Sequence, residues 1–314
     1  MRTINKEEIL TNLGHVVVLK GGTSAEREIS LISGNAVFNG LQRLGVKSSV
    51  IDVGESIISD LKDASPDLVF NMLHGQGGED GVIQGMLDVM GISYTGSGVL
   101  ASALAMDKVK SKLLWQQLGL RTPDFLILDE ETDWQGVIDR LERVVVKPVN
   151  GGSSLGISIV DNTKDLQQEY LSALEFDTQV MAEKCIEGKE FSTGVLDDQM
   201  FPTIQLETNR EFFDFDAKYK DGNTRIICPP RLSEEKLSEL EKLIRDAYES
   251  LGCTGLARVD LMQDEDGDFY LLELNTAPGM TEHSFVPMAA NQIGIDFDEL
   301  LLHILAAEKK QGEP

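Results

Sequence analysis

The sequence has few cysteines and no long apolar run, and each shortage excludes a class of protein. Its three cysteines, Cys185, Cys228 and Cys253, lie far apart and form no CxxC pair. This spacing predicts neither a disulfide framework nor a metal site built from cysteines. It favours a protein that resides in a reducing compartment. No apolar run approaches the roughly 18 residues that a spanning helix needs, and the N-terminus lacks the apolar stretch of a signal peptide. We therefore expect a cytoplasmic protein without a membrane segment.

Positive charge and the common nucleotide fingerprints are also scarce. The chain has 28 Lys and Arg residues against 53 Asp and Glu, a net charge of −25. This balance argues against a nucleic-acid or anionic-membrane surface, so an anionic ligand must be met by local cations. Neither GxGxxG nor GK[ST] occurs in the sequence, which argues against a nicotinamide dehydrogenase and a P-loop enzyme.

The chain is long enough to bury a large core divided into two or three domains. It has 314 residues, of which 41% are hydrophobic. In its first part, apolar runs at 15–20, 48–53 and 68–73 are typical of buried strands, and 30–41 has the apolar spacing of a helix. This alternation predicts a parallel sheet. Its glycine-rich turns follow the carboxyl ends of the strands, which is where such sheets bind ligands.

The pattern changes near residue 106. A helix is predicted at 107–118 and another at 232–251, with strands at 144–148, 179–184 and 191–195 between them. The polar segment 212–228 has no clear periodicity, and we expect a loop that acts as a lid. The predicted domains are 1–107, with 1–14 as an extension, then 108–190 and 191–314.

Near the C-terminus, a predicted strand at 268–275 carries two polar side chains in an apolar run. Glu273 and Asn275 share one face, because side chains alternate along a strand. A turn at 264–267 allows the preceding strand to fold back, so that Asp260 lies beside them. Two carboxylates and an amide form an all-oxygen site suited to Mg²⁺. The alternative interpretation is an exposed acidic hairpin.

A second candidate site follows the predicted strand that ends at Lys147. Glycines and serines at 149–156 can present backbone N–H groups to phosphate oxygens, and Lys147 adds a positive charge. The alternative is an ordinary glycine-rich turn. Three further residues have equally plain alternatives: Lys108 as a surface lysine, Glu183 in a charged turn, and Glu26 as a partner of a helix dipole.

Seven motifs in this order resemble the D-alanine–D-alanine ligases of the ATP-grasp superfamily. They are GGTSAERE at 21–28, HGQGGEDG at 74–81, YTGSG at 94–98, DK at 107–108, GSSLG at 152–156, FDAKY at 215–219 and ELNTAPGMT at 273–281. The resemblance extends from about His15 to Leu305. It implies an α/β fold, in which a parallel-sheet N-terminal domain precedes a two-part ATP-grasp fold with ATP between two antiparallel sheets.

The resemblance also implies a set of ligand-binding residues. The residues implied for ATP are Lys108, Lys147, Ser153, Ser154, Glu183, Lys184, Ile186, Glu190 and Phe212. Two Mg²⁺ or Mn²⁺ ions are expected on Asp260, Glu273 and Asn275. Among these, Glu183 is expected at adenine and Glu190 at ribose.

For the amino-acid substrates, the resemblance implies a ligase that joins two D-alanines through an acyl phosphate. Glu26 is expected to bind the first ammonium, and Arg258 with the backbone of Gly279 to stabilise the tetrahedral oxyanion. The other expected residues are Ser284 and Phe285 at the second substrate, His74 near its amine, Lys218 and Tyr219 in a closing ω-loop, and Ser153 linking Tyr219 to Glu26. Phe285 stands where the family commonly has leucine.

Two rival functions remain at this stage. A depsipeptide ligase that joins D-alanine to D-lactate is one, although the pair Lys218-Tyr219 favours an amine nucleophile by resemblance. A non-catalytic ATP-binding regulator is the other, and it should have lost a metal ligand or Arg258. By resemblance the ligase is a homodimer that serves peptidoglycan synthesis, with D-alanine and ATP as its small-molecule partners.

Overall fold

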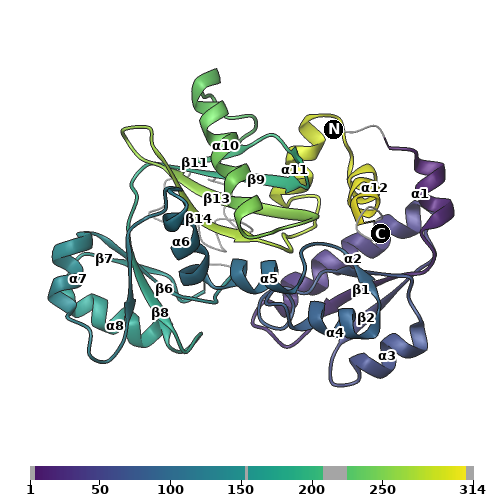
Figure 1. The fold of residues 1–314 in the computed structure, drawn as a ribbon, viewed down its shortest axis with the longest axis horizontal. Coiled ribbons are helices and arrows are strands. Elements are labelled where there is room, and N and C mark those ends of the chain that lie inside the picture. The colour runs from purple at the N-terminus through teal and green to yellow at the C-terminus, as the bar shows by residue number, and fades with distance from the viewer. Residues whose placement is uncertain (1–3, 153–154, 208–224, 309–314) are drawn as a thin grey trace.

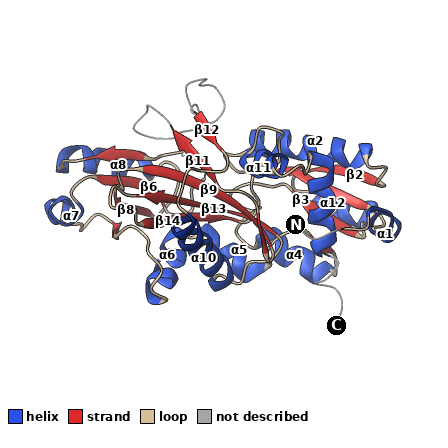
Figure 2. Cartoon of the chain, turned by 90° about the horizontal axis from the view of Figure 1, so that it is seen from above, coloured by secondary structure: helices blue, strands red, loops and turns tan. Residues whose placement is uncertain are grey.

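The computed structural model describes residues 4–152, 155–207 and 225–308. Its strands form three sheets arranged along an elongated molecule (Figure 1). Seen from above, the first sheet occupies one end, and the strands of the other two lie together toward the opposite end (Figure 2). Within the described ranges, no helix combines the length and the apolar character needed to span a membrane.

The first sheet is parallel, as the alternation of strands and helices predicted. Its order is β2-β1-β3-β4. The strands are β1 (Val16–Gly21), β2 (Ser48–Val53), β3 (Leu68–Asn71) and β4 (Ser93–Tyr94). The helices of this region are α1 (Lys6–Asn12), α2 (Arg27–Arg43), α3 (Ile57–Ala64), α4 (Val82–Met90) and α5 (Val99–Met106).

Strand β1 is apolar from Val16 to Leu19, where helices cover both of its faces. Val16 and Val18 belong to the core that includes α2, whereas Val17 and Leu19 belong to the core that includes α3 and α4. Alternate side chains therefore enter different cores, which explains why the strand reads as a continuous hydrophobic run.

The second sheet is antiparallel, in the order β5-β8-β6-β7. Its strands are β5 (Phe125–Leu128), β6 (Val144–Pro148), β7 (Ser158–Val160) and β8 (Val180–Lys184), with α7 (Trp134–Leu141) and α8 (Thr163–Ala173) packed against them. Helix α6 (Lys108–Gln117) precedes this sheet. Asp107 caps its start by accepting a hydrogen bond from the Lys110 backbone at 2.9 Å.

The third sheet is also antiparallel and has six strands, in the order β12-β11-β9-β13-β14 with β10 paired to β9. They are β9 (Lys189–Leu196), β10 (Gln199–Met200), β11 (Ile204–Glu207), β12 (Arg225–Ile227), β13 (Leu256–Gln263) and β14 (Phe269–Asn275), and α10 (Glu234–Ser250) packs on β13 and β14. The loop predicted at 212–228 is therefore wrong at its end. Residues 225–227 pair with β11, and Ile226 packs against a hydrophobic core.

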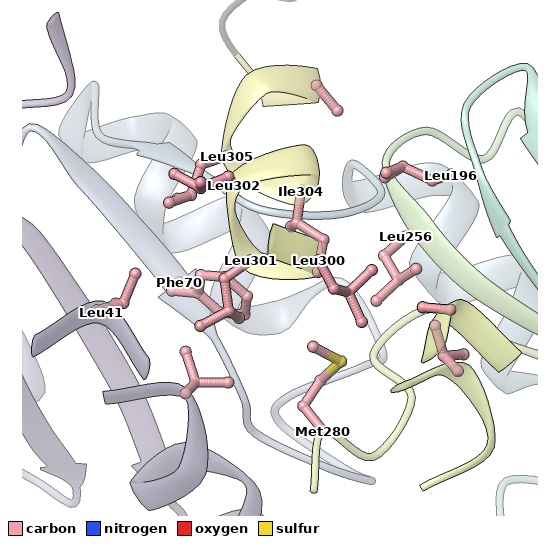
Figure 3. Packing of buried hydrophobic residues seen from close by; sticks show 14 of the residues in the cluster. Leu41, Phe70, Leu196, Leu256, Met280, Leu300, Leu301, Leu302, Ile304 and Leu305 are labelled. Atoms are coloured by element: carbon pink, nitrogen blue, oxygen red, sulfur yellow. The ribbon is translucent and has the colours of Figure 1, made fainter. Parts of the chain in front are cut away.

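The last two helices, α11 (Phe285–Gln292) and α12 (Phe297–Glu308), return to the first sheet. Leu301 of α12 lies beside Leu41 of α2 and Phe70 of β3 (Figure 3). A Cβ atom added at Gly40 would lie 2.4 Å from Leu301 Cδ1, so glycine is needed where α2 meets α12. Helix α1 also contacts α12, which gives residues 6–12 a packing role. The domain boundaries near 107 and 190 stay a prediction.

Candidate active site

A cavity of about 440 Å³ opens between the second and third sheets and reaches the loops of the first. Every predicted site residue within the described ranges lines it. These are Glu26, His74, Lys108, Lys147, Glu183, Lys184, Ile186, Glu190, Arg258, Asp260, Glu273, Asn275, Gly279, Ser284 and Phe285. The other five predicted residues, Ser153, Ser154, Phe212, Lys218 and Tyr219, lie outside the described residues.

The β13–β14 hairpin brings together the three predicted metal ligands. The register pairs Asp260 with Glu273, in line with the sequence prediction that Asp260 lies beside the two polar residues of β14, and it pairs Arg258 with Asn275. Asn275 Nδ2 donates to Asp260 Oδ2 at 3.2 Å. Ser192 Oγ, on the neighbouring β9, donates to Asp260 Oδ1 at 2.6 Å. These contacts hold the Asp260 carboxylate at the cavity wall.

Arg258 is oriented by two neighbours. Its Nε and Nη2 atoms donate to the Asp260 carboxylate at 2.9 and 2.6 Å, and its guanidinium group lies 5.9 Å from the centre of the Phe285 ring. Ser284 precedes α11, and its Oγ accepts from the Thr281 backbone at 3.0 Å. A Cβ atom at Gly279 would lie 3.1 Å from Ser284 Oγ, so this backbone runs close to the serine.

Three lysines and two glutamates form a group that we call the lysine cluster: Lys108, Lys112, Lys147, Glu183 and Glu273. Lys108 Nζ donates to the Gly151 carbonyl at 2.5 Å and lies 3.1 Å from Glu273 Oε2. Lys147 pairs with one oxygen of Glu183, and Lys112 with the other at 2.9 Å. Burial alone would raise the pKa of Glu183, but Lys112 and Lys147 outweigh it and lower that pKa.

A second group, the N-terminal cluster, consists of Glu26, His74 and Glu79. Glu26 precedes α2 at the cavity wall. A Cβ atom on Gly152 would lie 2.6 Å from Oε2 of Glu26, so glycine lets the backbone at 151–152 approach the Glu26 carboxylate. His74 is buried, and among the described residues its Nε2 atom has no hydrogen-bond partner. Burial and the nearby Arg258 lower the pKa of His74 to about 4.

Sequence reasoning missed two residues of these clusters. Glu79 accepts hydrogen bonds from the backbone of Gly75 at 2.7 Å and of Ala277 at 3.2 Å. Burial and the neighbouring Glu26 raise its pKa to about 8. Its position inside the 74–81 motif was an available signal. Lys112 is fully buried, and its only signal was the spacing of four residues from Lys108, which places both on one helix face.

The remaining predicted ATP residues, Lys184, Ile186 and Glu190, line the cavity near the connection between β8 and β9. Lys184 has a side chain that is 46% exposed and pairs with Glu142 at 3.3 Å, so the charge of Lys184 faces solvent. Ile186, in the connection between β8 and β9, and Glu190, in β9, also line the cavity.

The three-sheet fold has close counterparts among solved structures. The D-alanine–D-alanine ligase from Bacillus anthracis complexed with ATP matches with a TM-score of 0.83 and 32% identity, covering 95% of this chain and 98% of that one. The VanG D-Ala:D-Ser ligase from Enterococcus faecalis matches with a TM-score of 0.79 and 29% identity, covering 95% and 100%. The fold is that of the ATP-grasp ligases, as the motifs implied.

Sequence comparison narrows this class to one family. The pattern described as D-ala D-ala ligase C-terminus matches residues 114–306, and the one described as D-ala D-ala ligase N-terminus matches 53–97. D-alanine–D-alanine ligases from Saccharophagus degradans and Nitrosococcus oceani are 50% and 49% identical over 295 residues, covering 94% of this chain and 94% and 93% of theirs. The chain belongs to the D-alanine–D-alanine ligase family.

Proposed function

We propose that the protein is a cytoplasmic enzyme that joins two D-alanines into D-alanyl-D-alanine for peptidoglycan precursors, with release of ADP and phosphate. The observation that carries the proposal is the meeting of two clusters at one cavity. The lysine cluster offers positive charge to phosphates, while Glu26 of the N-terminal cluster offers a carboxylate to an ammonium group. Family membership supports the same reaction.

In the proposed site, Lys108 and Lys147 contact the nucleotide phosphates. Glu183 faces the adenine and Glu190 the ribose, with Lys184 and Ile186 beside them. Ser153, Ser154 and Phe212 are assigned to the same nucleotide by resemblance. The support is the shared cavity, in which the described members of this set lie between the second and third sheets.

The oxygen atoms of Asp260, Glu273 and Asn275 fit hard divalent cations. Two carboxylates and an amide on paired strands are the donor set that Mg²⁺ or Mn²⁺ prefers, and all three residues line the cavity. We propose that they hold two such ions. Bound there, the ions would neutralise charge on the ATP phosphates and hold them in line for transfer.

The protein's own residues then position the two amino acids. The carboxylate of the first D-alanine, held through its ammonium by Glu26, attacks the γ-phosphorus, which forms an acyl phosphate and releases ADP. The amine of the second D-alanine, held through its carboxylate by Ser284 beside Phe285, attacks the acyl carbon, and phosphate leaves. Arg258 and the Gly279 N–H stabilise the tetrahedral oxyanion as preorganised donors.

The state of His74 suits a place near the second amine. Its lowered pKa keeps the imidazole neutral near pH 7, so it does not repel an ammonium group. Lys218 and Tyr219 are proposed, by resemblance, to belong to a loop that closes the site and excludes water from the acyl phosphate, with Tyr219 linked through Ser153 to Glu26.

Two organisational features are also proposed. The chain is divided at about residues 107 and 190 into an N-terminal substrate-binding part and two ATP-grasp parts. The enzyme is a homodimer, as the resemblance implies. Light scattering of the purified protein tests the second statement, and a monomer at micromolar concentration would contradict it.

The first experiment is product mass together with ADP release. Purified protein receives ATP, Mg²⁺ and D-alanine, with L-alanine, D-lactate and D-serine in parallel as second substrates. We expect a D-alanyl-D-alanine mass and ADP in the mixtures that contain D-alanine, and neither product when D-alanine is left out. A dominant depsipeptide in the D-lactate mixture would favour the depsipeptide ligase instead. The absence of ADP from every mixture would favour the non-catalytic regulator.

A further inference from the structure

Lys112 lies inside the protein, where it makes two hydrogen bonds and one ion pair. Its side chain has no exposed surface. Nζ donates to Thr122 Oγ1 at 2.6 Å and to the Leu271 carbonyl at 3.3 Å, and it lies 2.9 Å from Glu183 Oε2. An ammonium group has three N–H donors, and three acceptors surround this one. Nζ of Lys112 is therefore directed at three oxygen atoms of the protein itself.

Its position relative to the cavity differs from that of the other lysines in the cluster. Lys108 and Lys147 line the cavity, as does Glu183, whereas Lys112 is not among the described residues that line it. Glu183 is thus held from two sides. Lys147 pairs with one carboxylate oxygen at the cavity wall, and Lys112 pairs with the other from behind.

Further hydrogen bonds tie together the segments around Lys112. Thr122 Oγ1 donates to the Leu271 carbonyl at 2.7 Å, and the Leu271 N–H donates to the backbone carbonyl of Arg121 at 2.9 Å. These bonds join the segment after α6 to β14. Lys112 therefore connects three elements, α6, β14 and β8, through one buried ammonium group.

The need for a rear counter-charge follows from the cost of burying an anion. A buried carboxylate is stable only when it is paired. Under the proposed function, Lys147 also contacts nucleotide phosphates, and any turn of its ammonium group toward them weakens its pairing with Glu183. Lys112 is not placed to make that turn, because its side chain is fully buried and is not among the described residues that line the cavity.

We propose that Lys112 is a positioning residue that holds the Glu183 carboxylate ionised and in place behind the nucleotide wall, so that Lys147 can engage phosphate. The proposal rests on the proposed function, because it assigns Glu183 and Lys147 to ATP. It predicts an effect on nucleotide binding from a residue that does not touch the nucleotide.

The test is Lys112→Met, which keeps most of the side-chain volume and removes the charge. We expect the KM for ATP to rise by about tenfold or more, as happens when an outer partner of a binding group is removed. The KM for D-alanine should change by less than about threefold, because Glu26 and Ser284 are untouched. Calorimetry with ATP should show the same loss of affinity. The control is Lys110→Met on the exposed face of α6, with ATP KM within about twofold of the parent.

A purely structural role is separated by two further variants. Thr122→Val removes one anchor of Lys112 but leaves the pair with Glu183, so it should lower the melting temperature without a comparable rise in ATP KM. In a Glu183→Gln background, Lys112→Met should add little to the loss of ATP affinity, because its target charge is already absent. A full additional loss in that background, or an unchanged ATP KM in the single variant, would overturn the proposal.

These outcomes are distinct from failure of the proposed function. If the parent protein releases no ADP with D-alanine, the function is wrong. If the parent is active and Lys112→Met binds ATP normally, only the role of Lys112 is wrong. If Lys112→Met fails to fold, the proposal is tested by comparing Glu183→Gln with the double variant. Equal ATP affinity of these two proteins supports the proposal. Weaker ATP binding by the double variant contradicts it.

Discussion

The two clusters that meet at the cavity treat buried glutamates in opposite ways. In the lysine cluster, Glu183 is 2% exposed, and its pKa is lowered because Lys112 and Lys147 outweigh the effect of burial. In the N-terminal cluster, Glu79 is 9% exposed, and its pKa is raised to about 8 by burial and by Glu26. Burial is similar in both, so the neighbouring charges decide the direction of the shift.

The difference also matches the ligands that each cluster is proposed to meet. With all five groups ionised, three lysines against two glutamates leave the lysine cluster one positive charge in excess, which suits phosphate. The N-terminal cluster has two carboxyl groups around a neutral histidine, which suits an ammonium group. A net charge of −25 therefore does not prevent the binding of an anion, because the local balance is reversed at one wall.

The largest expected effect comes from removing an acidic group at the lysine cluster. Glu273→Gln keeps the side-chain shape but removes the partner of Lys108 and a proposed metal ligand. Turnover should fall by on the order of 10³-fold or more, with the melting temperature nearly unchanged because the side chain is 25% exposed. Steady-state ADP release and thermal melting measure both.

The matched control for that variant is Glu265→Gln in the exposed turn of the same hairpin, which should remain active. Asp260→Asn should lose activity as Glu273→Gln does, since its carboxylate also faces the cavity. Normal turnover in either site variant would remove the metal assignment and, with it, the main functional contrast between the clusters.

An intermediate effect is expected on the pH dependence of stability through Glu79. Its folded pKa is about 8 and its ordinary value 4.5, so between these values the folded state holds a proton that the unfolded state has lost. Stability contributed by this group therefore falls as pH rises from about 4.5 to 8. When the pH is raised from 5.5 to 8.5, the melting temperature of Glu79→Gln should fall by at least about 3 °C less than that of the parent.

The control for Glu79 is Glu55→Gln, a change of the same kind at an exposed position outside the cavity. It should follow the parent at every pH. If Glu79→Gln also followed the parent, burial and Glu26 would not raise the pKa of Glu79, and the contrast with Glu183 would fail.

The smallest effect should come from His74, with the opposite slope. Its folded pKa of about 4 lies below the ordinary 6.5, so in that window the unfolded state holds the extra proton. Stability from this group falls as pH drops from about 6.5 to 4. His74→Gln should lose roughly 2 °C less than the parent on acidification from pH 7 to 5, measured by thermal melting.

His283→Gln provides the comparison for that measurement, because His283 is exposed. An equal response of the two histidine variants to acid would mean that His74 is protonated as readily as a surface histidine. The neutral imidazole in the N-terminal cluster would then be wrong.

Local patterns predicted the parts of the fold and site that depend on short-range periodicity. The alternation along 268–275 predicted that Glu273 and Asn275 share a face, and the turn at 264–267 predicted that Asp260 lies beside them. The parallel first sheet followed from strand and helix alternation in the same way. The order of the motifs then implied the ATP-grasp fold, which the solved relatives confirm.

What escaped prediction depends on contacts between distant segments. Lys112 meets Glu183 across 71 positions of sequence, and no local pattern distinguishes it from a surface lysine. Glu79 acquires its shifted pKa from burial in the folded protein and from Glu26, which belongs to a different loop. Strand β12 was read as loop because three residues are too few to show a period.

The packing of α12 on α2 has a consequence for synthesis on the ribosome. The core beneath the first sheet combines Leu41 and Phe70 with Leu301, so residues made early are covered by a helix made almost last. A nascent chain therefore exposes this apolar surface until nearly the whole protein has emerged. Chains that end before residue 297 lack the helix that covers this surface, and we expect them to be prone to aggregation.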